Sequence, residues 1–399
     1  FYFSRGSLIS IFANVIIVPA VEILVVSGFI VSVVGMIFAP LAQLLEGGNL
    51  VLLWVTNALV QGAASISWAS VNLVPPSLPF LLGYYALLVV VMEKLRCGEK
   101  IIMDKARWGI LAVSILAVFI WHLAMGPVGI ALEHPLTVTF LDVGQGDSIL
   151  VESPSGKRML IDGGGREAGS KSRYDVGAKV VVPELAKKGI NYLDVVVLTH
   201  PHEDHVGGLP AVLRNIKVGM VLDSGQVHTS LSYRKFLKLV EDKGISYKLA
   251  SAGMKLDLGD GVNGIILNPT EPLITGSDSD LNNNSVVIRL TYGKISFLFT
   301  GDAANEAEAR IMDFAAHNNL SLESTVLKVG HHGSATSSSE EFLGAISPKL
   351  AIISLGRKNK YHHPHKSLME RLNKLGVKIF RTDKHGTIVV ETDGTAVAV

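Results

Sequence analysis

The chain has 399 residues, 48% of them hydrophobic, and a mean hydropathy of +0.39, which is too apolar for an ordinary soluble protein and long enough for two or more domains. Its 36 basic and 35 acidic residues give a net charge of +1 and divide evenly, because residues 1–134 carry six of each sign and the remainder carries 30 basic and 29 acidic. This balance excludes a protein that attracts polyanions through its overall charge. Any nucleic-acid binding must therefore use a local basic patch. The single cysteine, Cys97, excludes an intrachain disulfide.

Val, Ile, Leu, Ala and Phe dominate the chain up to about residue 125. Four apolar runs lie at 20–38, 50–66, 78–92 and 108–125. A membrane-spanning helix needs about 20 apolar residues, so the first and last runs are long enough to span. Pro19 is expected to separate the first run from 7–18, which would be the end of another span or a re-entrant piece. We therefore predict a transmembrane helical segment over residues 1–126; the alternative is the buried helical core of a soluble protein.

Charge predicts the orientation of this segment. The loop at 93–107 carries five basic and three acidic residues, and short basic loops tend to stay in the cytoplasm. The run at 108–125 should then end outside, which places everything after residue 126 on the outer side. Glu22 lies in an apolar run, where it should face a bundle interior or a wet cavity. Because the chain begins with Phe inside apolar sequence, we expect it to be a piece of a longer protein.

From residue 136 the apolar residues alternate as in β-strands, and we predict a second, α/β domain over 136–399. Strands are expected at 137–143, 148–152, 158–162, 195–198, 285–290, 295–299, 325–329, 350–354, 378–381 and 387–391. Helices are expected at 177–188, 210–215, 233–243, 303–316, 340–345 and 366–375. Pro183 fits the first of these helices only if it stands near the helix start.

A cluster of potential metal ligands follows the strand expected at 195–198. His200, His202, Asp204 and His205 occupy six positions directly after this apolar run. A turn can fold these side chains back toward one point, whereas a single strand or helix would spread them over different faces. Neutral imidazoles bind divalent metals, and a carboxylate favours a second or harder ion. The sequence therefore predicts a metal site here, and the alternative is a polar surface loop.

Two more strands end in residues of the same kind. Asp302 closes the strand at 295–299, and its two oxygens could bridge two cations; the alternative is an N-cap of the helix from 303. His331 and His332 follow the strand at 325–329. One of them should complete a second metal site with Asp204 and His205, and the other should protonate a leaving group. The spacing does not decide between them; we assign His331 to the metal and count His332 and Asp204 as catalytic.

Asp162 is expected to support the site without binding metal. It precedes three glycines, and its carboxylate can accept backbone N–H bonds from an adjacent loop and so hold the ligand turn in shape.

A basic, histidine-rich stretch lies late in the chain, at 357–365. We expect Arg357, Lys360 and His365 from this stretch, together with Lys328, to contact substrate phosphates, and His363 to assist proton transfer. The alternative is a solvated surface loop. Two cations a few ångströms apart would hold a hydroxide and offset the charge of an attacked phosphate, so hydrolysis is the expected reaction.

The loop at 200–205 resembles the metal loop of the metallo-β-lactamase superfamily, and the resemblance implies a four-layer αββα sandwich with two metal ions. Further motifs lie at 140–148, 160–164, 282–287, 299–302 and 328–334. With the apolar segment before them, the whole arrangement resembles the ComEC family of competence channels, which take DNA into bacteria.

This resemblance implies a multi-pass protein of the bacterial inner membrane. Its membrane part would form the pore for a single DNA strand, and its outer lactamase-like domain would degrade the other strand of a double-stranded substrate. The implied partners are DNA, the lipid bilayer and other DNA-uptake proteins. Two alternatives remain: a surface metallo-hydrolase of another phosphodiester or of a lactone, and a DNA-binding transport protein whose lactamase-like domain does not cut.

One departure from the superfamily concerns the first metal. A third histidine often precedes the bridging aspartate, but 277–285 contains none. The amide oxygen of Asn283 or Asn284, or a water, would take its place, and we assign Asn284. Oxygen in place of nitrogen makes manganese at least as expected as zinc.

Overall fold

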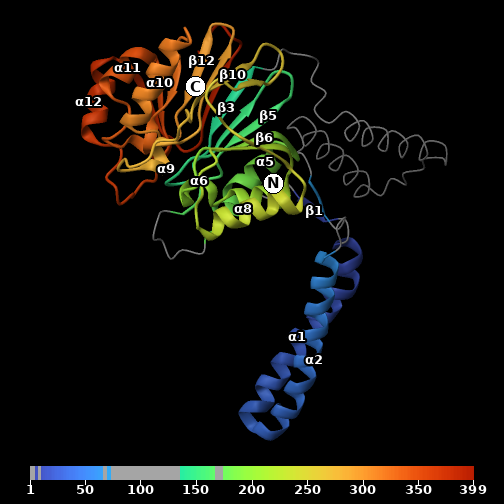
Figure 1. Ribbon diagram of the computed structural model, residues 1–399. Coiled ribbons are helices and arrows are strands. Elements are labelled where there is room, and N and C mark those ends of the chain that lie inside the picture. The colour runs from blue at the N-terminus through green and yellow to red at the C-terminus, as the bar shows by residue number, and fades with distance from the viewer. Residues whose placement is uncertain (1–4, 8–9, 66–69, 73–134, 167–173) are drawn as a thin grey trace, which may run out of the picture. The chain divides into compact units, whose positions relative to one another are not determined.

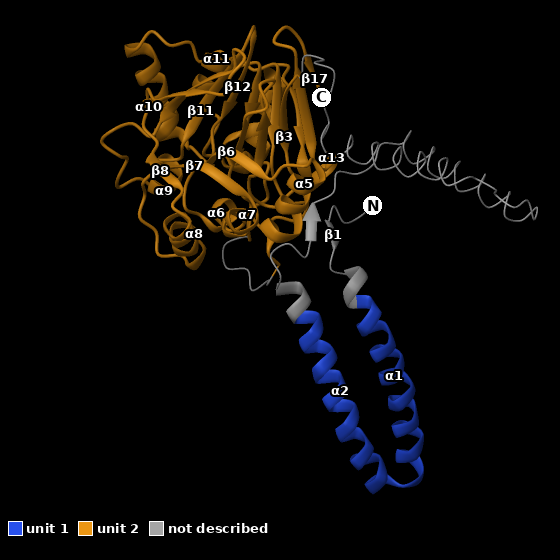
Figure 2. Cartoon of the chain, turned by 90° about the vertical axis from the view of Figure 1, so that its right-hand side faces the viewer, with its two compact units in different colours: residues 1–107 blue, residues 108–399 orange. Residues whose placement is uncertain are grey.

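The computed structural model describes residues 5–7, 10–65, 70–72, 135–166 and 174–399. The chain divides into two compact units, Phe1–Arg107 and Trp108–Val399 (Figure 2). The apolar runs predicted at 78–92 and 108–125, and most of the predicted junction between the two domains, lie outside the described residues.

The first unit contains a helical hairpin. Helix α1 (Ser10–Ile37) and helix α2 (Ala39–Ser65) lie side by side (Figure 2), and Ser27 Oγ lies 2.6 Å from Asn49 Oδ1 between them. Two short strands, β1 (Arg5–Ser7) and β2 (Ser70–Asn72), pair antiparallel. Within the described part of the chain, one helix, over Asn14–Ile37, is long and apolar enough to cross a membrane.

The predicted break at Pro19 is wrong, because α1 runs through this residue without interruption. A proline inside a helix removes one backbone hydrogen bond, but apolar helices tolerate it where neighbouring groups re-satisfy the freed carbonyl. Helix α2 also starts eleven residues before the run expected at 50–66, and it continues through Gly47 and Gly48. Pro40 stands in its first turn, where the missing N–H costs nothing.

The second unit contains two large sheets. The eight-stranded sheet has the order β17-β16-β3-β4-β5-β6-β7-β8, and the seven-stranded sheet has the order β15-β14-β13-β12-β11-β10-β9. The strands of the first sheet are β3 (Leu136–Phe140), β4 (Ile149–Glu152), β5 (Arg158–Ile161), β6 (Tyr192–Leu198), β7 (Lys217–Asp223), β8 (Ser246–Leu249), β16 (Ile388–Thr392) and β17 (Val397–Ala398). Those of the second are β9 (Lys255–Asp257), β10 (Asn263–Asn268), β11 (Val287–Tyr292), β12 (Ile295–Phe299), β13 (Val326–Lys328), β14 (Leu350–Ile353) and β15 (Lys378–Arg381).

Helices cover both outer faces of the paired sheets. Figure 1 shows α10, α11 and α12 on one face and α5 and α8 on the other. The helical segments are η1 (Gly177–Val181), α5 (Val182–Lys187), α6 (Glu203–Val206), α7 (Leu209–Asn215), α8 (Leu231–Asp242), α9 (Asp280–Asn283), α10 (Asn305–His317), η2 (Gly330–Gly333), α11 (Glu340–Ile346), α12 (Lys366–Lys374) and α13 (Thr382–His385).

Three separate apolar clusters confirm the predicted αββα layering. Strand β6 illustrates how they arise, since successive side chains of a strand point to opposite faces. Val195 and Val197 belong to the central cluster between the sheets, whereas Val196 and Leu198 belong to the cluster beneath α7 and α8. A third cluster lies between the second sheet and helices α10 to α12.

Parallel strands bring the candidate ligands to one edge of each sheet. Strands β5, β6 and β7 are parallel neighbours in the first sheet, and β12, β13 and β14 are parallel neighbours in the second. The carboxyl ends of parallel strands meet at one edge, which is where α/β proteins usually bind ligands. The loops after β5, β6, β12 and β13 hold Asp162 and the candidate metal ligands.

All ten expected strands and all six expected helices correspond to elements of the structure, with shifts of a few residues at their ends. Pro183 lies at the start of α5, after the π-helical turn η1, as its position required. Strands β7 to β10 and β17 and helices α6, α9 and α13 were not expected. Strand β8 shows why, because all four of its residues are exposed and no apolar alternation marks it.

Candidate metal centre

A tight turn places the four candidate ligands of the loop at 200–205. Strand β6 ends at Leu198, and His202, in an extended conformation, is the N-cap of the one-turn helix α6. Its carbonyl accepts hydrogen bonds from His205 N at 3.0 Å and from Val206 N at 2.9 Å. Because α6 turns the chain back, His205 is fully buried beside His200, with ring centroids 4.2 Å apart.

Glycines after β5 and between β3 and β4 allow the backbone there to pack directly on this loop. A Cβ atom at Gly165 would lie 1.8 Å from the carbonyl oxygen of Glu203, and one at Gly146, whose φ is +127°, would lie 2.1 Å from that of Asp204. Neither contact is possible for a larger residue without moving the metal loop.

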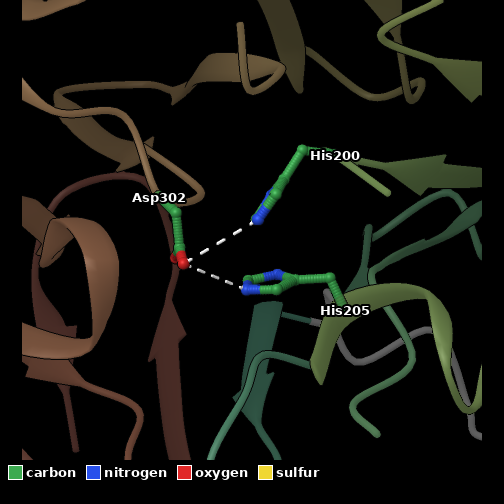
Figure 3. A group of neighbouring side chains, drawn as sticks. All are labelled: His200, His205 and Asp302. Carbon is green, nitrogen blue, oxygen red and sulfur yellow. Dashed lines mark ion pairs between the residues drawn. The ribbon is translucent and has the colours of Figure 1, made fainter. Parts of the chain in front are cut away.

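Asp302 stands at the centre of the cluster. Its Oδ2 atom lies 3.3 Å from His205 Nε2, 3.4 Å from His332 Nε2, and 3.9 Å from the Nε2 atoms of both His200 and His331. Figure 3 shows the carboxylate pointing at His200 and His205, with the aspartate and the two histidines arriving from opposite sides. Asp302 Oδ2 is therefore the oxygen that faces all four imidazoles, and Asp302 would be a ligand of any ion bound among them.

Asp162 holds His205, one of the candidate ligands, in its orientation. The fully buried carboxylate accepts hydrogen bonds from Thr199 N at 2.8 Å and Thr199 Oγ1 at 2.7 Å, and its Oδ2 lies 2.7 Å from His205 Nδ1. His205 Nδ1 therefore carries a proton, and Nε2 is left to face Asp302.

His332, and not His331, joins Asp204 and His205. Its Nε2 lies 3.5 Å from Asp204 Oδ2 and 3.3 Å from His205 Nε2, while Nδ1 donates to the Ser354 carbonyl at 3.0 Å. Ligand atoms of Asp204, His205 and His332 all lie within 4.8 Å of one another, and the described residues offer no such group that contains His331. The geometry therefore favours His332, and not His331 as expected, as the third member of this group.

His331 lines the cavity instead. Its side chain is 28% exposed, Asn282 Nδ2 lies 3.3 Å from Nε2, and Nδ1 has no hydrogen-bond partner among the described residues. This histidine is accordingly the member of the pair that a substrate can reach.

Lys328 does not face substrate, so its predicted role is wrong. It is 1% exposed, and its ammonium pairs with Asp147 and donates to the Gly301 carbonyl at 2.9 Å. Burial disfavours its charge, but Asp147 and Asp302 outweigh burial and raise the pKa of Lys328. The ammonium lies 3.8 Å from Asp302 Oδ1, the oxygen that points away from the histidines.

The ring nitrogens and carboxylate oxygens of this cluster are suited to binding cations. The Nδ1 protons of His205 and His332 are committed to Asp162 and Ser354, so the Nε2 atoms of both rings face each other and Asp302 Oδ2. Burial opposes protonation of both rings, but Asp302 and the neighbouring carboxylates raise the pKa of His332 to about 10 and that of His205 well above its usual range. The electric field at these nitrogens thus strongly favours a positive charge.

The other two histidines of the metal loop are neutral at pH 7. Burial lowers the pKa of His200 well below its usual value and also lowers that of His202. His200 Nε2 lies 3.0 Å from His202 Nδ1, within hydrogen-bond distance, so these two ring nitrogens are close together. Neutral imidazole is the form that binds metal.

The late histidine-rich stretch divides into one part at the site and one part away from it. A cavity of about 150 Å³ is lined by His202, Asp204, Asp302, His331 and His332, and also by Gln145, Glu203, Asn282, Tyr361 and His363. The ring of His363 stacks on Tyr361, and burial lowers its pKa to about 4. His363 is therefore neutral at pH 7 and cannot act as an imidazolium acid.

The remaining predicted substrate contacts do not line this cavity. Arg357 Nε donates to the Asp383 carbonyl at 3.0 Å, Lys360 lies over the Tyr361 ring, and His365 is the N-cap of α12, accepting from Ser367 N. Gln145, which the sequence did not single out, is 5% exposed, and its Nε2 has no partner among the residues that the structure describes. Its sequence signal was its position inside the motif at 140–148, two residues before Asp147.

The assignment of Asn284 as a substitute ligand is also wrong. Its Oδ1 accepts from Ile274 N at 2.9 Å, and its Nδ2 donates to the carbonyls of Ile274 and Asp280. Asn284 therefore fixes a loop, and Asn282 is the asparagine that reaches the cavity.

The protein families that match this sequence agree with the fold and the candidate metal site. The sequence profile of the metallo-β-lactamase superfamily matches residues 141–357, and that of the competence protein family matches residues 1–96. Because the first match covers more than half of the chain, the chain belongs to the metallo-β-lactamase superfamily.

Curated proteins from two bacteria are similar to this chain. ComE operon protein 3 of Bacillus subtilis (strain 168) is 30% identical over 403 residues, covering 97% of this chain and 49% of that protein. Competence protein ComA of Neisseria gonorrhoeae is 32% identical over 256 residues, covering 64% of this chain and 32% of that protein. With the competence-family match at residues 1–96, these similarities show that the chain resembles competence proteins in both of its parts.

The chain spans about half the length, or less, of these curated relatives. Among solved structures, the metallo-β-lactamase fold protein YhfI from Bacillus subtilis is 13% identical with a TM-score of 0.42, covering 64% of this chain and 99% of that one.

Proposed function

We propose that the chain takes part in DNA internalisation during natural transformation. The apolar segment contributes to a channel for one DNA strand, and the metal centre hydrolyses phosphodiester bonds of the other strand with two divalent ions, Mn²⁺ or Zn²⁺. The observation that carries the proposal is the convergence of four imidazoles on Asp302 Oδ2 in a chain that joins a competence segment to a metallo-β-lactamase domain.

Two sets of side chains would hold the ions. His200 and His202 form the first site, Asp204, His205 and His332 form the second site, and Asp302 is shared between them. Two bound ions supply a hydroxide at neutral pH and offset the charge of the attacked phosphate.

The chain's own residues orient the substrate. His331 accepts from Asn282 at Nε2 and lines the cavity, where its ring would help to position the attacked phosphate. Gln145 Nε2 is an unpaired donor at the cavity and would bind a phosphate oxygen. His363, neutral and stacked on Tyr361, adds a hydrogen bond and not a proton.

We place the protein in the bacterial inner membrane with several spans, other DNA-uptake proteins as partners and the metal domain on the outer side. A peptide tag after Val399 tests this orientation in cells whose inner membrane is intact. Removal of the tag by added protease supports it, whereas protection until the membrane is lysed rules it out.

Cleavage of linear duplex DNA tests the reaction. The full chain, purified in detergent micelles and stripped of metal, is incubated with end-labelled duplex and either Mn²⁺ or Zn²⁺. Wild type should cut, and Asp302→Asn should cut more than about 100-fold more slowly, because it loses the shared ligand. Asp313→Asn is the matched control, since this exposed aspartate of α10 makes the same exchange away from the site and should keep wild-type activity.

Two other outcomes overturn the nuclease. If wild type binds DNA but cuts none with either ion, the domain serves transport without hydrolysis. If it turns over only small diesters or lactones in an Asp302-dependent way, it is a hydrolase of another substrate class.

A further inference from the structure

Three consecutive asparagines follow one another at the end of α9, and two of them are fully engaged in holding the loop. Asn283 Oδ1 accepts from Ala304 N at 3.3 Å, and its Nδ2 donates to Ser277 Oγ at 3.0 Å. Asn284 bonds Ile274 through both ends of its amide. These bonds fix the position of α9 beside the metal centre without using any atom of Asn282.

Asn282 is the exception. It is 3% exposed, it lines the cavity together with His202 and Asp302, and its Nδ2 lies 3.3 Å from His331 Nε2. Its Oδ1 is buried and has no hydrogen-bond partner in the part of the chain that the structure describes. Since buried carbonyl oxygens are almost always satisfied, an unpaired one at the edge of a ligand cluster points to a missing partner that carries positive charge.

The first metal site also has fewer protein ligands than the second. The second site has three protein ligands besides Asp302, whereas the first has only His200 and His202. A carbonyl oxygen is a hard, neutral ligand of the kind that Mn²⁺ and Mg²⁺ accept readily.

We propose that Asn282 Oδ1 is the third protein ligand of the first metal, beside His200, His202 and the shared Asp302. The inference rests on the proposed two-metal function and names the ligand that makes the two sites unequal. The second site, with two imidazoles and two carboxylates, binds its ion tightly. The first site exchanges one imidazole for an amide oxygen, binds more weakly, and prefers Mn²⁺ to Zn²⁺.

Metal titration of the full chain in detergent micelles tests this proposal without an activity assay. The quantity measured is Mn²⁺ bound at equilibrium, from the loss of the free-ion electron paramagnetic resonance signal. Wild type should bind two ions with different affinities. Asn282→Ala should keep the tighter ion and bind the weaker one about tenfold or more less tightly. Asn282→Asp, which keeps the oxygen and adds charge, should bind the weaker ion at least as tightly as wild type.

A histidine at this position gives a second, independent readout. Asn282→His supplies the imidazole that the superfamily often has there, so it should shift the weaker site toward Zn²⁺ in a competition between the two ions. Asn263→Ala is the control, because the side-chain amide of this exposed asparagine on β10 donates to the nearby Gly261 carbonyl and does not line the cavity. Circular dichroism establishes that each variant is folded.

The possible results distinguish a failure of this inference from a failure of the proposed two-metal function. Two Mn²⁺ ions bound to Asn282→Ala with wild-type affinities would overturn the role of Asn282 and leave the metal centre intact. No metal bound to wild type would overturn both. Loss of both ions from Asn282→Ala, with recovery of neither in Asn282→Asp, would show that the residue supports the loop and is not a ligand.

Discussion

Replacing Asp162 with Asn or Ala tests whether this residue sets the tautomer of His205 or only fills space in the core. Asp162 Oδ1 accepts from Thr199 N, and Oδ2 is shared by Thr199 Oγ1 and His205 Nδ1, all within 2.8 Å. Asp162→Ala leaves three buried donors without an acceptor. Each costs about 1–3 kcal/mol, and since removal of the buried carboxylate offsets part of this, we expect the free energy of unfolding to fall by about 3–5 kcal/mol.

Asp162→Asn separates stability from metal binding. The amide oxygen still accepts from Thr199 N, so the metal-free protein should lose only about 1–2 kcal/mol. The amide nitrogen, however, faces His205 Nδ1 and donates where the carboxylate accepted. His205 then moves its proton to Nε2, the atom that faces Asp302, and affinity at the second site should fall about 10–100-fold.

The assay pairs denaturant unfolding in the presence of a chelator with metal titration of the same variants. Asp194→Asn is the matched control, because Asp194 also accepts a backbone N–H, from Arg158 at 2.8 Å, but has no bond to a histidine. The tautomer argument is refuted if Asp162→Asn binds both ions as tightly as wild type, or if its loss of affinity does not exceed that of the control.

Three further predictions follow from the same contacts. Lys328→Met leaves two buried carboxylates without their cation and should lower the free energy of unfolding by about 3–5 kcal/mol, measured by denaturation. Gly165→Ala pushes a methyl group against the Glu203 carbonyl and should lower metal affinity, whereas Gly344→Ala, with open space at a helical position, should be neutral or slightly stabilising. In chelated protein the pKa of His332 is about 10, above its unfolded value, so its contribution is fully present below about pH 6.5 and is lost as the pH rises toward 10. Unfolding at pH 7 and pH 9 should show this fall, and a flat profile would contradict it.

The parts of the site that could be predicted are those in which each ligand stands directly after an apolar run. His200, Asp302 and the His331–His332 pair all follow buried parallel strands, and the carboxyl ends of such strands converge whatever the loops do. Strand order, the pairing of the two sheets and the identity of the amide at the site depend on contacts between distant segments, and no local pattern encodes them.

The burial of Lys328 could have been predicted from the alternation of apolar residues along β13. Val326 and Leu327 lie in different apolar clusters, on the two faces of β13. Lys328 has the same parity as Val326 and must point between the sheets, where only a carboxylate partner could keep its charge. Asn282 and Asn284 offered no such signal, since their side chains are identical and only the anchoring of α9 decides which one faces the cavity.

The two adjacent histidines could not be told apart because their directions come from a strained turn. Both adopt left-handed backbone conformations, with φ of 48° and 52°, which cost non-glycine residues about 1–2 kcal/mol each. His331 N donates to the Gly301 carbonyl and His332 Nδ1 to that of Ser354, and these bonds hold the turn in place. The strain turns the two rings apart, to an angle of 67°, so that one reaches the second metal site and the other opens onto the cavity. An unstrained strand or helix would also separate neighbouring side chains, but it would not bring both Nε2 atoms within 4 Å of the same carboxylate oxygen.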